Sequence, residues 1–315
     1  MKNVLLCGCG NIGFRHLQAM TAMRDPVAIT IVEPFEAAHG RIAEHIKAAE
    51  ASTGHRFALC HDIPGPPEQF DLAVIATSAP TRAAAYDSIV ARHGVKVMIL
   101  EKLLFQTLTE LEAVGASIAE KGIKAFVNCG RRGFPGYHVL KAGLAGQRPL
   151  HLHVSGTQFG MASNTVHFLD LAEYLNDSAM VEVDVSGLQP GSVPSKRGGF
   201  VEVYGTITGR LANGATLRID CLDEPAIAVQ VAIKGTGAAV LIDEVARVQT
   251  QDGTASIFAA RNVSEMPEFY QNALTKGDPG LTPYADSARQ HRLFLTAMRD
   301  HLGLSNAADE PCPIS

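Results

Sequence analysis

The sequence predicts an α/β protein of two domains: a doubly wound parallel sheet, then an α/β domain with an open, largely antiparallel sheet. Three observations lead to this prediction. The chain has 315 residues, about twice the length of an average domain. Up to about residue 130, short apolar runs alternate with helical patterns, which is typical of parallel strands joined by helices. After about residue 150, runs with period-two alternation replace them, as in antiparallel strands.

The first domain, predicted to cover residues 1–124, contains short β-branched runs and segments with apolar residues at helical spacing. The expected strands are residues 4–7, 28–32, 72–76 and 96–100, with a fifth at 124–127 crossing the domain boundary near 125. The expected helices are residues 11–23, 37–51, 81–92 and 109–121, and Gly122 closes the last one. Because such crossovers are right-handed, helices should cover both faces of the sheet.

The second domain is predicted to cover residues 125–315. Its expected strands are residues 151–155, 201–207, 215–221 and 228–234. Asn213-Gly214 is a hairpin turn signal between two of them. Helices are expected at residues 167–175 and about 283–302, and the Gly-, Pro- and Ser-rich segment 189–199 is expected to be a loop.

Composition excludes several classes of protein. Apolar residues make up 46% and charged residues 19% of the chain, with a net charge of −5 and no block of Lys and Arg, so no nucleic-acid partner is expected. Apolar runs are far shorter than the roughly 18 residues that span a bilayer, and no signal peptide is recognised, so a cytoplasmic location is expected. The six cysteines have no C-x-x-C spacing, so no metal site is expected.

A G-x-G-x-x-G pattern lies between the first expected strand and helix, at Gly8-Cys9-Gly10-Asn11-Ile12-Gly13. Gly8 permits a tight turn, Gly10 lets the backbone approach a diphosphate, and Gly13 lets the helix pack closely on the strand. The diphosphate is then held at the positive end of the helix. The loop, including Asn11 and Ile12, is therefore a predicted dinucleotide-binding site.

Glu33 supports this interpretation and predicts which dinucleotide is bound. It lies 33 − 13 = 20 residues after Gly13, directly after the second expected strand, where a carboxylate accepts hydrogen bonds from the ribose hydroxyls. Because a carboxylate at this point repels a 2′-phosphate, NAD is expected rather than NADP. Arg15 and Arg41 are the residues that could reverse this preference.

Four segments in order resemble the glucose–fructose oxidoreductase and inositol dehydrogenase family (Gfo/Idh/MocA). They are GCGNIGFRH at the N-terminus, Ala76-Thr77, Glu101-Lys102, and His167 with Asp170 three residues later. The resemblance extends from residue 1 to about 300 and implies a Rossmann domain followed by an α/β domain whose open sheet often forms the oligomer interface. Segments 76–82, 101–106, 127–132 and 163–171 further resemble a branch associated with bacterial surface-polysaccharide sugar synthesis.

The resemblance implies an NAD-dependent oxidoreductase that transfers hydride between the nicotinamide and a secondary alcohol or carbonyl of a sugar, cyclitol or nucleotide sugar. Lys102, at a strand end, is then expected to contact the cofactor and to stabilise charge on the substrate oxygen. His167 is expected to be the acid/base, because imidazole titrates near neutral pH. Thr77 is expected at the cofactor, and Glu101 either contacts the nicotinamide ribose or braces the turn.

Four further residues are predicted to face the substrate. Arg131 and Arg132 are adjacent on a loop and suit a phosphate or carboxylate, with surface charge as the alternative. Tyr137 can stack on a sugar or pack a helix. Asn164 can contact the substrate or cap the helix that follows it.

The sequence departs from the family pattern at two points. Leu103 follows Glu101-Lys102 where the family has Pro, and Ser163 stands where many members place an Asp, four residues before the histidine. Neither Ser163 nor Asn164 can act as a carboxylate base. Two alternatives are therefore a dinucleotide-binding regulator without catalysis and a redox-neutral enzyme that holds its NAD tightly. A homodimer or homotetramer acting on a small sugar-like molecule is expected.

Overall fold

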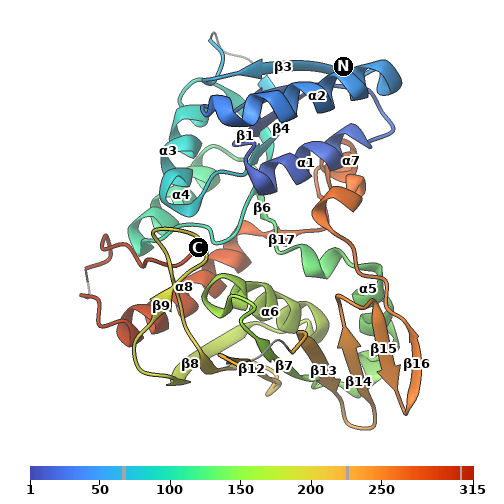
Figure 1. Cartoon of the computed structure of the whole chain (residues 1–315), viewed down its shortest axis with the longest axis vertical. Coiled ribbons are helices and arrows are strands. Elements are labelled where there is room, and N and C mark those ends of the chain that lie inside the picture. Colours follow the sequence, from blue (N-terminus) through green and yellow to red (C-terminus); the bar gives the residue numbers. More distant parts are fainter. Residues whose placement is uncertain (66–68, 225–226, 306) are drawn as a thin grey trace. The chain divides into compact units, whose positions relative to one another are not determined.

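The structure is a computed structural model that describes residues 1–65, 69–224, 227–305 and 307–315, and Figure 1 shows its helices and strands. The chain divides into two compact units. The first comprises residues 1–105, 110–128 and 261–285, and the second comprises residues 106–109, 129–260 and 286–315. This division differs from the predicted boundary near residue 125, because the segment 261–285 returns to the first unit.

The first unit is built on a sheet with the strand order β17-β6-β5-β4-β1-β2-β3. Its strands are β1 (Lys2–Cys7), β2 (Val27–Val32), β3 (Arg56–Cys60), β4 (Gln69–Ile75), β5 (Gly94–Leu100), β6 (Lys124–Val127) and β17 (Thr282–Pro283). The accompanying helices are α1 (Asn11–Thr21), α2 (Glu36–Thr53), α3 (Ala79–Val90), α4 (Leu108–Glu120), α7 (Pro267–Lys276) and the 3-10 helix η3 (Val263–Glu265). All described pairs in this sheet are parallel except β17 with β6.

The strand order reverses at β1, and this reversal positions the ligand site. From β1 the chain builds outward through β2 and β3, and then returns to add β4 on the other side of β1. Val4, Leu5 and Leu6 at the sheet centre are 0% exposed, as expected for a strand covered on both faces. The connections diverge here, so the carboxyl ends of β1 and β4 form the topological switch point, which is where ligands of open α/β sheets bind.

The second unit contains a sheet with the strand order β16-β15-β14-β13-β7-β12-β11-β8. Its strands are β7 (His151–Thr157), β8 (Met180–Leu188), β11 (Gly205–Leu211), β12 (Thr216–Leu222), β13 (Gln230–Lys234), β14 (Ala239–Asp243), β15 (Val248–Gln251) and β16 (Thr254–Ile257), and β9 (Val193–Pro194) pairs separately with β10 (Val201–Glu202). The helices are α5 (Pro135–Gly143), α6 (Met161–Asn176), α8 (Tyr284–His301), and the 3-10 helices η1 (Gly130–Gly133) and η2 (Ala145–Gln147). Described pairs are antiparallel except β7 with β12.

These two sheets confirm the predicted fold class. The Asn213-Gly214 turn joins β11 to β12 as expected, with Gly214 at φ +86°. Burial alternates along β12, with Leu217, Ile219 and Cys221 buried, and α6 packs against this strand. No helix among the described residues is long and apolar enough to cross a membrane.

Several elements differ from the sequence prediction. The expected strand 201–207 is two strands, β10 and β11, separated by Val203 and Tyr204. Helix α6 begins at Met161, six residues earlier than predicted, because its first turn contains Ala162, Ser163 and Asn164, which show no apolar spacing. Strand β3 was not predicted, although Phe57 to Cys60 form a short apolar run; none of its residues is fully buried. Strand β8 was also missed, although Val and acidic residues alternate along it.

Candidate functional site

The three glycines of the G-x-G-x-x-G pattern between β1 and α1 differ in the space around them. Gly8 has φ +85°, and a Cβ atom on it would lie 2.9 Å from the backbone nitrogen of Thr77. A Cβ atom on Gly13 would lie 2.0 Å from the carbonyl oxygen of Gly8. A Cβ atom on Gly10 would meet nothing within 4 Å. Gly8 and Gly13 are thus required by the protein itself, whereas Gly10 leaves open space at the amino end of α1.

Glu33 fastens the glycine loop to the end of β2. Its Oε2 accepts a hydrogen bond of 2.7 Å from the backbone N–H of Cys9, and its Oε1 accepts one of 3.0 Å from that of Phe35. Glu33 is only 4% exposed. Each carboxylate oxygen has a second lone pair, so Glu33 can still accept ribose hydroxyls. Its part in holding the loop was not predicted from the sequence.

Arg41, from α2, lies across the same loop. Its Nη2 is 3.3 Å from the carbonyl oxygen of Gly10, and its Nη1 is 3.5 Å from Oδ1 of Asn11. The guanidinium carbon also stands 4.3 Å from the centre of the Phe14 ring, a cation–π distance. The positive charge of Arg41 therefore lies beside the glycine loop, where it would attract an anionic phosphate group.

Thr77 follows β4 at the carboxyl edge of the sheet and has an unsatisfied hydroxyl. Among the described residues, its Oγ1 is a buried oxygen with no hydrogen-bond partner. Buried polar atoms are rarely left unpaired, so a missing partner is a sign of a ligand. Together with the open backbone at Gly10 and the carboxylate of Glu33, this hydroxyl shows that the residues fit a bound dinucleotide.

Glu101 and Lys102 follow β5, two strands from the glycine loop. The carboxylate of Glu101 is buried and accepts hydrogen bonds at Oε1 from His16 Nε2 (2.8 Å) and Asn128 Nδ2 (2.5 Å). Burial acts to raise the pKa of Glu101, but the hydrogen bond and charge of His16, the amide of Asn128 and the charge of Lys102 together lower it. Of the two roles predicted for Glu101, bracing the turn is the one for which the structure provides contacts.

Arg82, on α3, connects the segment that follows β4 with the segment that follows β5. It is 2% exposed, and its guanidinium donates to the carbonyl oxygens of Thr77, Leu103 and Leu104, the last at 2.7 Å. The peptide bond between Lys102 and Leu103 is cis. Arg82 was not predicted as a site residue, although it lies in the segment 76–82 that carried the resemblance.

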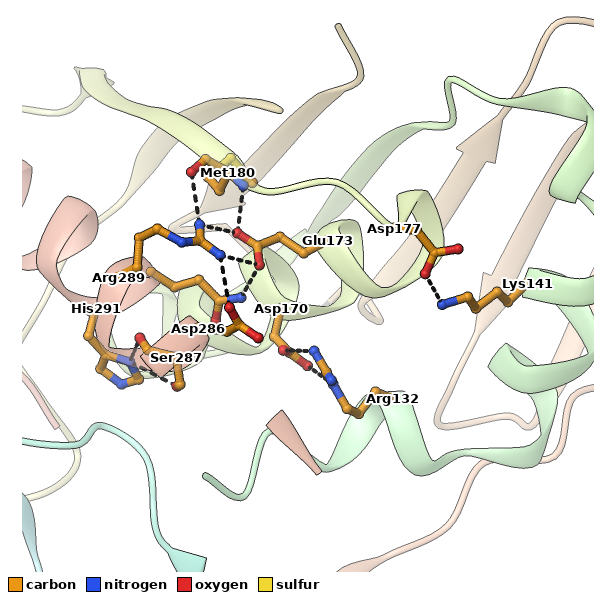
Figure 2. A network of polar contacts seen from close by, with 11 residues as sticks. Arg132, Lys141, Asp170, Glu173, Asp177, Met180, Asp286, Ser287, Arg289 and His291 are labelled. Carbon is orange, nitrogen blue, oxygen red and sulfur yellow. Dashed lines mark hydrogen bonds and ion pairs between the residues drawn. The ribbon is translucent and has the colours of Figure 1, made fainter. Parts of the chain in front are cut away.

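In the second unit, His167 lies on α6 and is half-buried. Figure 2 shows how the following turns of this helix are held. Asp170 accepts hydrogen bonds from Arg132 Nε (2.9 Å) and Nη2 (2.5 Å), and Glu173 accepts from Arg289 Nη1 (2.7 Å) and Nη2 (3.0 Å). Such two-pronged pairs fix orientation as well as distance. The helix that carries His167 is therefore held rigidly to η1 and α8.

The two predicted arginines have carboxylate partners within the protein. Arg132 pairs with Asp170, and Arg131 Nε donates to both oxygens of Glu244 at 3.0 Å. Tyr137 is 0% exposed, and its hydroxyl donates to Glu244 at 2.7 Å. A side chain buried in this way packs the core of the unit, so the predicted stacking of Tyr137 on a sugar is corrected.

Asn164 does not cap α6, which corrects the second role predicted for it. It lies in the first turn, and its Nδ2 donates to the carbonyl oxygen of Phe159 at 2.7 Å. The cap position is Gly160, at φ +77°. A carboxylate does lie at the amino end of α6, but it comes from β10: Glu202 Oε2 accepts a hydrogen bond of 2.9 Å from the N–H of Ala162. Sequence reasoning missed Glu202 because it lies 40 residues further along the chain.

The predicted residues fall into two groups, one in each unit. The glycine loop with Asn11 and Ile12, and Glu33, Thr77, Glu101 and Lys102, belong to the first unit, and Arg131, Arg132, Tyr137, Asn164 and His167 belong to the second. In the first unit, hydrogen bonds and close backbone packing connect the loop with Glu33 and Thr77. In the second unit, Arg132 and His167 are linked through the helix that carries Asp170. No group of metal-binding side chains is found among the described residues.

A comparison with protein-family models gives a match over the N-terminal part of the chain. The model of the GFO_IDH_MocA oxidoreductase family, described as having an NAD-binding Rossmann fold, matches residues 2–129. Residues 2–129 match this family, and the match covers about two fifths of the chain. The resemblance inferred from the glycine loop and Glu101-Lys102 is thereby confirmed. A comparison with curated protein sequences gives no significant match.

Solved structures with the same fold cover nearly the whole chain. UDP-N-acetylglucosamine 3-dehydrogenase GnnA from Acidithiobacillus ferrooxidans is 18% identical, with a TM-score of 0.69 over 94% of this chain and 96% of that one. An oxidoreductase from Agrobacterium radiobacter, in complex with NAD+, L-tartaric acid and magnesium, is 19% identical (TM-score 0.66; 96% of each chain). The super-repressor mutant of Gal80p from Saccharomyces cerevisiae is 13% identical (TM-score 0.67; 96% of each chain). At these identities the likeness shows that this chain and those proteins share a common fold.

Proposed function

We propose that the protein is an NAD-dependent dehydrogenase or reductase that transfers hydride between the nicotinamide and a secondary alcohol or carbonyl of a sugar, cyclitol or nucleotide sugar. The observation that carries this proposal is the dinucleotide cradle of the first unit: open backbone at Gly10, the carboxylate of Glu33, and the unpaired hydroxyl of Thr77. The bound nicotinamide would supply the hydride acceptor or donor. The amino end of α1 would hold the diphosphate, and Glu33 the ribose.

Each proposed site residue has a separate task. Lys102, at the carboxyl end of β5, would hydrogen-bond the substrate oxygen and stabilise the negative charge that develops on it. His167, on a helix held by Asp170 and Glu173, would accept the hydroxyl proton during oxidation and return it during reduction. The GnnA likeness makes a UDP-sugar the first substrate class to test. Arg131 and Arg132 are proposed as substrate contacts through the donors that Glu244 and Asp170 leave available.

The preference for NAD rests on Glu33, whose carboxylate would repel a 2′-phosphate. Arg41 acts in the opposite direction, because its guanidinium lies at the carbonyls of the same loop. Glu33 accepts a hydrogen bond of 2.7 Å from Cys9 of the loop, whereas Arg41 lies 3.3 Å from the carbonyl oxygen of Gly10. We therefore propose that the charge of Glu33 decides between the two dinucleotides.

Calorimetric titration with NADH and NADPH tests the cofactor, and oxidation of UDP-N-acetylglucosamine, myo-inositol and related polyols, followed by absorbance of the reduced nicotinamide, tests the reaction. We expect NADH to bind at least about tenfold more tightly than NADPH, a difference of about 1.4 kcal/mol. Failure to bind either dinucleotide would overturn the proposal.

A second candidate is a regulator that binds the dinucleotide without turning it over. It is favoured by Ser163 and Asn164, which leave the first turn of α6 without the acid that many family members have there. The fold shared with Gal80p is compatible with such a role. Rapid mixing of the NADH complex with each candidate substrate separates the two, because a regulator gives binding with no loss of reduced nicotinamide.

A further inference from the structure

Glu202, on β10, is a carboxylate that the fold brings to the amino end of α6 from 40 residues further along the chain. Strand β10 is fixed on two sides. Glu202 pairs with Val193 of β9, and the N–H of the preceding residue, Val201, donates to the carbonyl oxygen of Pro313 at 2.8 Å. Helix α6 packs against this strand. The position of the carboxylate is therefore set by the backbone of the second unit.

The two oxygens of Glu202 have different surroundings. Oε2 accepts a hydrogen bond from the N–H of Ala162 and so caps the helix. Oε1 lies beside Gly160: a Cβ atom on this glycine would be 3.3 Å from Oε1, 2.8 Å from Oγ of Ser163 and 3.3 Å from Nδ2 of Asn164. Capping thus accounts for one oxygen, and the other lies around the same point as the side chains of Ser163 and Asn164.

Ser163 and Asn164 belong to the accessible face of α6, and so does His167. These three residues are half-buried, whereas the other residues from 161 to 173 are buried. Their spacing of three and four residues places them on one face of the helix. Because a helical side chain leans back over the turn that precedes it, His167 leans toward the end of the face where Glu202 lies.

The first turn of α6 contains no acid of its own. The charged side chains further along α6, and those of the helices around it, form pairs of opposite sign. These pairs are Arg132 with Asp170, Arg289 with Glu173, Arg131 with Glu244, and Lys141 with Asp177. His138 of α5 contacts the carbonyl oxygen of Arg132. On the strands that α6 covers, the titratable side chains other than Cys221 lie on the solvent side of the sheet; they are His151, His153, Glu182, Asp184, Arg218 and Asp220.

Two titratable neighbours of Glu202, Cys221 and Tyr204, stay neutral. Burial raises the pKa of the Cys221 thiol, and the negative charge of Glu202 raises it further. Burial also raises the pKa of Tyr204, as do the charges of Asp223 and Glu202. Asp223 is exposed and accepts a hydrogen bond of 2.7 Å from Gln158. Glu202 thus adds a negative charge at the start of the accessible face.

Building on the function proposed above, we propose that Glu202 is a positioning residue that acts through His167, by favouring the protonated form of its ring. In the proposed oxidation His167 accepts the hydroxyl proton of the substrate and becomes an imidazolium ion, and the carboxylate, which remains ionised, stabilises that charge. In the reduction the imidazolium returns the proton to the substrate oxygen. Glu202 then does from β10 what an acid in the first turn of α6 would do, so Ser163 does not imply a loss of catalysis.

The titration of the His167 ring, followed by NMR of its Cε1–H group in protein with isotope-labelled histidine, tests the inference without cofactor or turnover. The signal that disappears in His167→Asn identifies this ring. Glu202→Gln is expected to lower the pKa of His167 by about 0.5–1, the effect of removing one opposite charge in a half-exposed place. Glu182→Gln, which neutralises an exposed carboxylate paired with Arg210 on the same sheet, is the matched control and should change nothing.

A rescue variant separates the charge of Glu202 from its capping of the helix. The amide oxygen of Gln can still accept from the N–H of Ala162, so Glu202→Gln should lower the melting temperature by less than about 4 °C. Adding Ser163→Asp to Glu202→Gln places a carboxylate beside the same point and should restore most of the His167 pKa. If Glu202→Gln leaves the His167 titration unchanged, Glu202 only caps the helix and the inference is wrong.

This test separates the inference from the proposed function. A His167 pKa that responds to Glu202 in a protein that oxidises no substrate would support the inference and count against the enzyme. An unresponsive His167 in an active dehydrogenase would do the reverse. If Glu202→Gln does not fold, Glu202→Asp, which withdraws the charge by one methylene group, is compared with the unmodified protein, and an equal His167 titration overturns the inference.

Discussion

Gly10 and Gly13 lie three residues apart in the same loop, and the structure predicts opposite consequences when each is replaced by alanine. At Gly10 an added methyl group meets no protein atom within 4 Å, and the backbone has φ −64°. Alanine therefore fits the folded protein. At Gly13 the methyl group would lie 2.0 Å from the carbonyl oxygen and 2.8 Å from the carbonyl carbon of Gly8. Both of those atoms belong to the backbone of the turn and cannot rotate away.

The expected magnitudes follow from these contacts. Gly10→Ala should change the free energy of unfolding by less than about 1 kcal/mol, the usual range when alanine fits the backbone. It should weaken NADH binding at least about tenfold, since the methyl group occupies space that a diphosphate needs. Gly13→Ala should destabilise the protein by roughly 1–3 kcal/mol through overpacking, which lowers the melting temperature by roughly 2–12 °C in a domain of this size.

Thermal unfolding with and without NADH, together with calorimetric titration of NADH, measures both effects. Gly122→Ala is a control for a glycine outside the loop, because it has a positive φ of +63° and no neighbour within 4 Å. It should cost some stability and leave NADH affinity unchanged. A Gly13→Ala protein with unaltered melting temperature, or a Gly10→Ala protein that binds NADH normally, would refute the assignment of these two glycines.

Three further predictions concern the candidate site, and a fourth concerns Asp71 near the start of β4. Glu33→Ala should reduce the ratio of NADH affinity to NADPH affinity, measured by calorimetry, mainly because NADH binds more weakly. If the variant and the unmodified protein have the same ratio, Glu33 does not set the preference. Lys102→Met should reduce turnover by roughly 10²–10³ while NADH still binds, as when a charge-stabilising donor is lost. His167→Asn should reduce turnover by about 10²–10⁴ with unchanged NADH affinity and melting temperature; a sharp loss of stability with normal activity would make it a core residue instead. Burial raises the pKa of Asp71, but hydrogen bonds from Lys96 and a backbone N–H lower it below the usual value, so its stabilising effect is present at neutral pH and is lost as the pH falls. Asp71→Asn should therefore lower the melting temperature near neutral pH, by an amount worth no more than about 1 kcal/mol, and have no effect below about pH 3.

The sequence by itself determined those features that depend on local order along the chain. The glycine loop, the acid 20 residues after it and the strands that flank them all lie within 33 residues of the N-terminus. Their roles follow from backbone conformation, which neighbouring residues set. The same is true of the central strands, because burial on both faces demands an apolar run that is visible in the sequence.

The tertiary structure decided which side chains meet when they are far apart in the sequence. Tyr270 contacts His16 across 254 positions, Glu244 pairs with Arg131 across 113, and Glu202 reaches the start of α6 across 40. From the sequence, Arg131 was predicted to bind a substrate anion or to be surface charge, because its partner Glu244 follows β14, 113 positions later. Periodicity reports which face of an element is buried, but it contains no information about the element that covers it. Partners of buried charges are set by packing between distant elements, and for that reason Tyr137, Arg132 and Glu101 were understood only once the fold was known.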